Sequence, residues 1–202
     1  MPVVEIQRLG AKALPGVCIA SRGPVRSILL VSKAPLSRIR TLAADEGSRT
    51  STLLARLILA ERFGAEPEVI PMAPELPAML GRADAALLIG DAALRFDPSG
   101  FPGEVLDLGA EWTRWTGKPM VFAVWAARPE LDLPGLSEML QASVEFGRGR
   151  IEEIVRAEAP RRKIPEGLAR TYLNDHIRFT LGEEEREGMA LFLDLVRRAV
   201  AV

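Results

Sequence analysis

Short runs of almost unbroken apolar residues recur along the first two thirds of the chain, and helix-like segments separate several of them. This alternation is typical of an α/β fold whose strands are covered on both faces. The runs predict strands at residues 3–8, 16–21, 26–32, 40–44, 67–72, 85–90, 104–108 and 120–128. Between them the sequence predicts a long helix over Ser51–Phe63, which Gly64 ends, and a short helix over 75–81.

Beyond Pro129 the pattern becomes helical. The sequence predicts helices at residues 135–146, 150–159, 165–172 and 183–200, with an extension of the third to Phe179 left open. No internal repeat or low-complexity tract interrupts the chain. We therefore expect an α/β fold followed by a helical C-terminal region.

Composition narrows the classes of function. The 202 residues include 26 Lys and Arg against 27 Asp and Glu, a net charge of −1, so the chain has no general attraction for nucleic acid or an anionic membrane surface. A single cysteine, Cys18, and a single histidine, His176, argue against a disulfide framework and a Cys/His metal site. No secretory signal pattern or membrane-spanning apolar run is present, so we expect a cytoplasmic protein.

The stretch GSRTS, residues 47–51, stands where a predicted strand turns into the long helix. The first backbone N–H groups of a helix lack internal acceptors and lie at the positive end of its dipole, so they attract a carboxylate or phosphate. Ser48, Thr50 and Ser51 would add hydroxyl donors there, and Arg49 would add a charged one. An ordinary N-cap needs only one of these hydroxyls. From the residues alone, both capping and anion binding stay open.

Two further turns carry candidate residues. Gly90 and Asp91 follow a predicted strand, where ligands of open α/β sheets bind, although an N-cap aspartate explains Asp91 equally well. Ser27 follows the turn marked by Gly23 and Pro24 and stands near the start of a predicted strand. Alone, its position indicates little.

Four segments, taken in order, give the chain a family resemblance. They are GPVRS, then GSRTS before a leucine-rich helix ending AERFG, then ADAALLIGDAAL, then LDLGAEWTRWTGKPMVFAVWAAR. It resembles the chorismate dehydratases of menaquinone biosynthesis, which act in the futalosine route. The resemblance implies a two-lobed fold like that of type II periplasmic binding proteins. It also implies a lyase that removes water from chorismate to give 3-[(1-carboxyvinyl)oxy]benzoate, with no metal or organic cofactor.

The resemblance assigns roles to the candidate residues. Ser27 matches a catalytic serine that faces the substrate between the lobes. The hydroxyl-rich turn would hold a substrate carboxylate, the Gly90–Asp91 turn borders the same cleft, and Glu5 matches a glutamate near it. The substrate-binding residues implied are Glu5, Ser48, Arg49, Thr50, Ser51, Gly90 and Asp91.

Family members carry an additional N-terminal segment with an asparagine and proline motif that contributes to the active site. Relative to them, the chain resembles a whole second lobe, residues 33–118, and part of the first, residues 1–32 and 119–202. Three explanations for the shorter N-terminus stay open: a misassigned start codon, a fragment, and a shortened paralogue that binds without catalysing. We favour the first two. An incomplete first lobe would expose a sheet edge, so we expect a homodimer with strand exchange.

Two other functions stay open. One is a small-carboxylate binding protein of the same fold, because fold does not fix function. The other is the 1,4-dihydroxy-6-naphthoate synthase related to the dehydratases. The combination of GPVRS and GSRTS resembles the dehydratases more.

Overall fold

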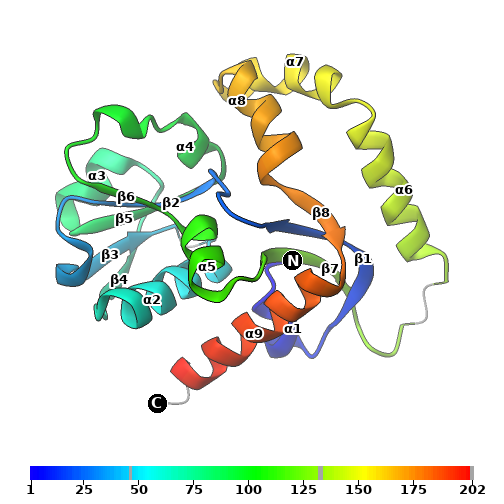
Figure 1. Ribbon diagram of the computed structural model, residues 1–202, viewed down its shortest axis with the longest axis horizontal. Helices are drawn as coiled ribbons and strands as arrows, with labels where there is room; N and C mark the ends of the chain where they lie inside the picture. The colour runs from blue at the N-terminus through cyan, green and yellow to red at the C-terminus, as the bar shows by residue number, and fades with distance from the viewer. Residues whose placement is uncertain (46, 132–133, 201–202) are drawn as a thin grey trace.

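The strands of the protein form two separate sheets in a two-lobed α/β arrangement (Figure 1). The structure is a computed structural model that describes residues 1–45, 47–131 and 134–200. One sheet has the strand order β4-β3-β5-β2-β6. Its strands are β2 (Ile28–Ser32), β3 (Thr41–Ala44), β4 (Glu68–Pro71), β5 (Ala85–Ile89) and β6 (Glu104–Asp107). The other sheet has the order β7-β1-β8 and consists of β1 (Lys12–Ser21), β7 (Met120–Ala127) and β8 (Arg178–Leu181).

Strand direction in the five-stranded sheet defines an edge where a ligand can bind. β3 is parallel to β4 and β5, whereas β2 is antiparallel to its neighbours β5 and β6. The carboxyl ends of β3, β4, β5 and β6 therefore meet the start of β2 at one edge. In open α/β sheets, ligands bind outside the carboxyl ends of the strands.

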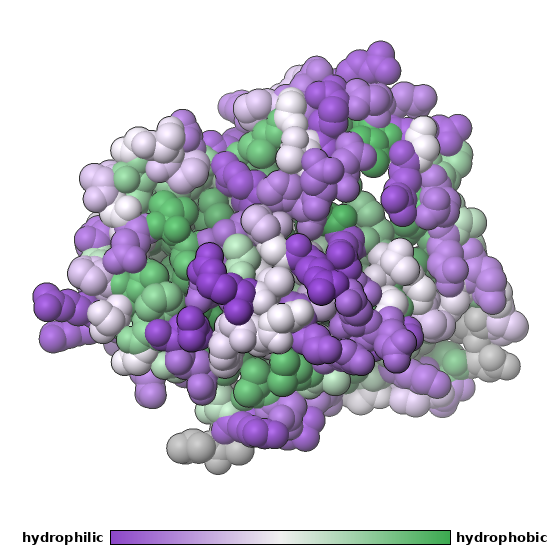
Figure 2. Space-filling view, viewed as in Figure 1, coloured by the Kyte–Doolittle hydropathy of each residue, from purple (hydrophilic) through white to green (hydrophobic). Residues whose placement is uncertain are grey.

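Helices surround both sheets. Those beside the five-stranded sheet are α2 (Arg49–Phe63), α3 (Leu76–Arg82), α4 (Gly90–Arg95) and α5 (Leu108–Thr116). Those of the other lobe are α1 (Glu5–Leu9), α6 (Leu136–Arg148), α7 (Ile151–Arg162), α8 (Glu166–Thr171) and α9 (Glu183–Val200). Figure 1 shows α7 and α8 reaching across the top of the molecule toward α4. Hydrophilic side chains cover most of the face in Figure 2.

A shared core joins the lobes. The larger hydrophobic cluster includes residues of both sheets together with α2, α5 and α9. Trp112 of α5 is fully buried and packs edge-on against Trp115 and against Phe192 of α9, with ring centroids 5.8 and 5.7 Å away. Its indole Nε1 donates to the Pro119 carbonyl at 3.1 Å. The aromatic contact fixes α5 of one lobe against α9 of the other.

One predicted strand is wrong, and the helix extension that the sequence left open does not reach Phe179. Residues 3–8 are not a strand, because Glu5–Leu9 forms helix α1, which Gly10 ends with a positive φ of 59°. The alternation of apolar and polar residues there resembled a strand, but an i,i+3 ion pair of Glu5 with Arg8 supports the helix. Residues 178–181 are strand β8 rather than a helix extension, because Ile177, Phe179 and Leu181 have the two-residue period of a strand paired with β1. Helix α5 was not predicted.

The boundaries predicted for the lobes stay a prediction. Because β2 pairs with β5 and β6, we propose that the second lobe begins at β2 rather than after it. Across the part of the chain that the structure describes, no helix combines the length and apolarity needed to cross a lipid bilayer.

Candidate functional site

The N-terminus of α2 opens at the carboxyl edge of the five-stranded sheet. β3 ends at Ala44, and Asp45 then shapes the turn, since its side chain accepts from the Gly47 N–H at 3.0 Å and its carbonyl accepts from the Ser48 N–H at 3.0 Å. The helix runs for 15 residues from Arg49, with Ser48 at the N-cap position. No described side chain caps it. The turn therefore presents a helix dipole and free hydroxyls at this edge.

Two hydroxyl groups at this turn are buried without partners. Ser48 and Thr50 are only 5% and 4% exposed. Among the described residues, neither Ser48 Oγ nor Thr50 Oγ1 has a hydrogen-bond partner. A buried hydroxyl without a partner costs about 1–3 kcal/mol, so a structural cap does not explain this arrangement. Ser48 also lines a cavity beside the turn, so a ligand with an oxygen acceptor there would satisfy its hydroxyl.

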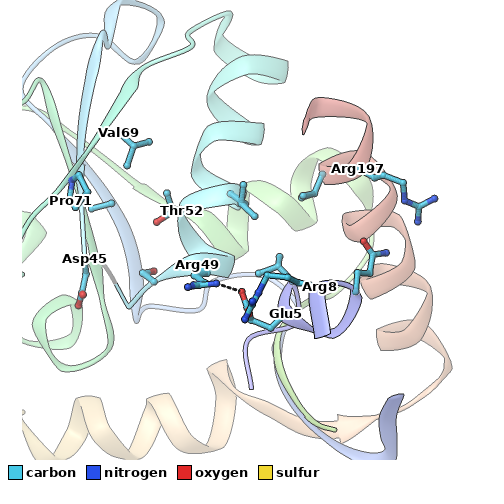
Figure 3. Close-up of a pocket in the computed structure, with 14 residues that line it drawn as sticks. Glu5, Arg8, Asp45, Arg49, Thr52, Val69, Pro71 and Arg197 are labelled. Atoms are coloured by element: carbon cyan, nitrogen blue, oxygen red, sulfur yellow. Dashed lines mark hydrogen bonds and ion pairs between the residues drawn. The ribbon is translucent and has the colours of Figure 1, made fainter. Parts of the chain in front are cut away.

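A cavity of about 750 Å³ adjoins the turn (Figure 3). Such a volume lies within the usual range of small-molecule sites. Its walls are mostly apolar, and polar side chains gather where α1 faces α2. The lining residues are Val4, Glu5, Gln7, Arg8, Ala44, Asp45, Ser48, Arg49, Thr52, Leu53, Val69, Pro71, Val196 and Arg197. Three of the predicted site residues, Glu5, Ser48 and Arg49, thus share one cavity.

Glu5 connects the two lobes at this cavity. Its carboxylate accepts from the Arg49 guanidinium at 2.7 Å and from Arg8 Nε at 2.6 Å. Figure 3 shows Arg49 and Arg8 converging on Glu5, whereas the Arg197 guanidinium points away from them. The hydrogen bonds from Arg8 and then Arg49 lower the pKa of the Glu5 carboxyl below its ordinary value. The three groups together carry a net positive charge beside the α2 turn.

Acid should remove the contribution of Glu5 to stability. Because its folded pKa lies below the ordinary value of 4.5, the contribution is complete above that pH and is lost as the pH falls through the folded pKa. We expect wild type to be more stable than Glu5→Gln at pH 7, and urea denaturation should show this gap closing toward pH 3. Glu145→Gln, at an exposed residue of α6, is the matched control. A gap that stays constant with pH would contradict the assigned ion pairs.

Thr50 and Ser51 are buried and do not line the cavity. They follow Arg49 in the first turn of α2. Burial of Ser51 was not predicted from the sequence. Their contact with a substrate stays a prediction.

Ser27, Gly90 and Asp91 gather at the same sheet edge but outside this cavity. Ser27 precedes β2, Gly90 follows β5, and the Gly90 N–H donates to the Ser27 carbonyl at 2.8 Å. Gly90 has a φ of 57°, a left-handed conformation that glycine adopts readily. The Asp91 carboxylate makes no cap but pairs with Arg162 of α7 at 3.0 Å.

Residues missed by the sequence analysis hold Ser27 in place. Arg26 has a φ of 62°, which is unusual for a residue with a side chain. The Asp107 carboxylate accepts from the N–H groups of Val25 and Arg26 at 3.0 and 2.7 Å, and the Arg26 guanidinium donates to carbonyls of Ala93 and Phe96. The loop before β2 is therefore fixed from β6 and α4. The arginine of GPVRS, Arg26, was the sequence feature that could have indicated this role.

Comparison with known proteins identifies the family. A family model described as menaquinone biosynthesis matches residues 7–198. The chain belongs to this family. It is 34% identical over 197 residues to a chorismate dehydratase of Thermus thermophilus, a match covering 90% of this chain and 72% of that protein. A 1,4-dihydroxy-6-naphtoate synthase of Streptomyces coelicolor is 31% identical over 109 residues, 52% of this chain and 38% of that enzyme.

Solved structures confirm the fold of this menaquinone-biosynthesis family member. A protein from Archaeoglobus fulgidus superposes with a TM-score of 0.76 at 18% identity, over 100% of this chain and 78% of that one. A putative nitrate transport protein from Thermoplasma volcanium gives a TM-score of 0.51 at 13% identity, over 98% of this chain and 77% of that one. At these identities the likeness shows the two-lobed α/β fold alone.

Proposed function

We propose that the protein is a hydro-lyase that converts chorismate to 3-[(1-carboxyvinyl)oxy]benzoate and water, in the futalosine route of menaquinone biosynthesis. The family supports the pathway, and the match to a chorismate dehydratase over 90% of the chain supports the reaction. The observation that carries the proposal is the buried Ser48 Oγ at the α2 turn, which borders the cavity and lacks a hydrogen-bond partner among the described residues.

The sheet edge suits a substrate with two carboxylates. The α2 turn would hold one of them through Ser48, Arg49, Thr50 and Ser51. The start of β2 lies two strands from β3 in the sheet order, about 10 Å away at the usual strand spacing. Ser27 and the Gly90–Asp91 turn would contact the other end of the substrate there.

The reaction requires little acid–base catalysis from the protein. The ring carbon that carries the enolpyruvyl ether loses its proton, the neighbouring carbon loses its hydroxyl, and the two leave as water while the ring becomes aromatic. Positioning the substrate and excluding solvent can lower such a barrier substantially. Ser27 would donate to a substrate oxygen that gains negative charge. Glu5 would fix the direction of Arg49.

Incubating the protein with chorismate tests the proposal. We expect chorismate to be converted to a product lighter by one water, with benzenoid ultraviolet absorbance, without added cofactor. Chorismate left unchanged both by this chain and by the chain extended with its upstream in-frame residues would contradict the reaction. Reversible chorismate binding in calorimetry without conversion would instead favour a small-carboxylate binding protein. For either function, the homodimeric state and the cytoplasmic location stay predictions.

The 1,4-dihydroxy-6-naphtoate synthase reaction is a second candidate because that relative is 31% identical to part of the chain. Its match covers 52% of this chain against 90% for the dehydratase, so we favour the dehydratase. Formation of 1,4-dihydroxy-6-naphthoate from that enzyme's substrate, with chorismate left unchanged, would reverse the preference.

A further inference from the structure

The helical segment after α8 reaches across to Ser27. Tyr172 begins a π-helical stretch, Tyr172–His176, that leads from α8 to the strand β8 of the other lobe. Its phenol hydroxyl donates to Ser27 Oγ at 3.2 Å. The two residues lie 145 positions apart in the chain. π-Helical turns are rare and occur frequently at functional sites.

This contact determines what the Ser27 hydroxyl can do. A serine hydroxyl has one proton to donate and two lone pairs that accept. A phenol is the more acidic of the two hydroxyls, so Tyr172 is the donor and Ser27 the acceptor. Ser27 is only 5% exposed, and no other hydrogen bond of its Oγ occurs among the described residues. The Ser27 proton is therefore available to a ligand at the sheet edge.

We propose that Tyr172 is a positioning residue that orients Ser27 as a hydrogen-bond donor to the substrate oxygen that gains negative charge during dehydration. The inference rests on the proposed function, since it assigns Ser27 to that reaction. Tyr172 acts through Ser27 and does not itself touch the reacting atoms. The proposal adds to the site a residue from the helical C-terminal region.

The surroundings of Tyr172 hold it in this role. Burial raises the pKa of its phenol, an effect that the hydrogen bond to Ser27 opposes in part, so the group keeps its proton at neutral pH. Two contacts hold the end of α7 against α4: the Arg162–Asp91 ion pair at 3.0 Å and the hydrogen bond from Arg95 to the Arg162 carbonyl at 3.1 Å. The phenol therefore meets Ser27 at a fixed position.

Steady-state kinetics with chorismate test the role in four proteins: wild type, Tyr172→Phe, Ser27→Ala and the double variant. We expect Tyr172→Phe to lower kcat about tenfold, the value of one hydrogen bond, while KM changes less than about threefold. In the Ser27→Ala background the same change should have no further effect, because Tyr172 acts through Ser27. Arg170→Gln, which breaks an exposed ion pair of α8 with Glu152, controls for general loosening and should retain wild-type kcat.

A Tyr172→Phe enzyme with wild-type kcat would overturn the inference, as would equal losses in both backgrounds. An active wild type with either result leaves the proposed reaction standing. If wild type binds chorismate without converting it, the reaction fails, and calorimetry on the same four proteins then tests the inference. Tyr172→Phe should weaken binding only when Ser27 is present. A protein that neither binds nor converts chorismate overturns both.

Discussion

Replacing Ser48 and Thr50 together by alanine is expected to raise KM for chorismate about a hundredfold while kcat falls less than about tenfold. Each hydroxyl would donate to a carboxylate, and such charged hydrogen bonds contribute about 1.5–3 kcal/mol each. The carboxylate is held in the ground state and the transition state alike, so the loss falls mainly on KM. Steady-state kinetics measure it, with Ser143→Ala on the exposed face of α6 as the control and Thr50→Ser as the variant that keeps the hydroxyl.

Stability in the absence of ligand separates this role from helix capping. Both hydroxyls lack partners among the described residues, so removing them should leave the urea midpoint unchanged or raise it. A capping residue would instead lose about 1 kcal/mol on change to alanine. A double variant that is less stable by that amount and has an unchanged KM for chorismate would show that the turn is an ordinary helix cap.

Trp112→Ala is expected to lower the free energy of unfolding by about 3–5 kcal/mol, the usual cost of emptying a large buried aromatic site. The side chain is fully buried, packs against Trp115 and Phe192, and donates to the Pro119 carbonyl. It therefore joins α5 of one lobe to α9 of the other. Urea denaturation measures the loss.

Trp125→Ala is the matched control, because Trp125 is 54% exposed. We expect it to cost less than about 1 kcal/mol. Equal costs for the two tryptophan variants would show that the α5–α9 contact does not hold the lobes together.

The sequence predicted most of the buried sheet because its signal is local. Every residue of β2 is buried, and such a continuous apolar run is hard to mistake. The prediction failed at residues 3–8, where apolar and polar residues alternate as in a strand but form a short helix that Gly10 ends. Helix α5 was missed even though Asp107 and Gly117 mark its two ends, with an N-cap bond and a positive φ.

The candidate site divides in the same way between local and distant signals. The GSRTS turn was found from its residues, but only the structure shows that the Ser48 side chain caps nothing. Anion binding at the turn stays a prediction. The hydrogen bond of Tyr172 with Ser27 and the pairing of Asp91 with Arg162 join residues 145 and 71 positions apart. No pattern in a single sequence reports such contacts, because tertiary packing alone creates them.

A crystal structure of the protein with 3-[(1-carboxyvinyl)oxy]benzoate bound would show whether the α2 turn holds a substrate carboxylate. We expect one carboxylate at the start of α2, within about 2.7–3.2 Å of the Ser48 or Thr50 hydroxyl, and the rest of the bound product extending toward Ser27. A bound product whose two carboxylates both lie away from the α2 turn would contradict it.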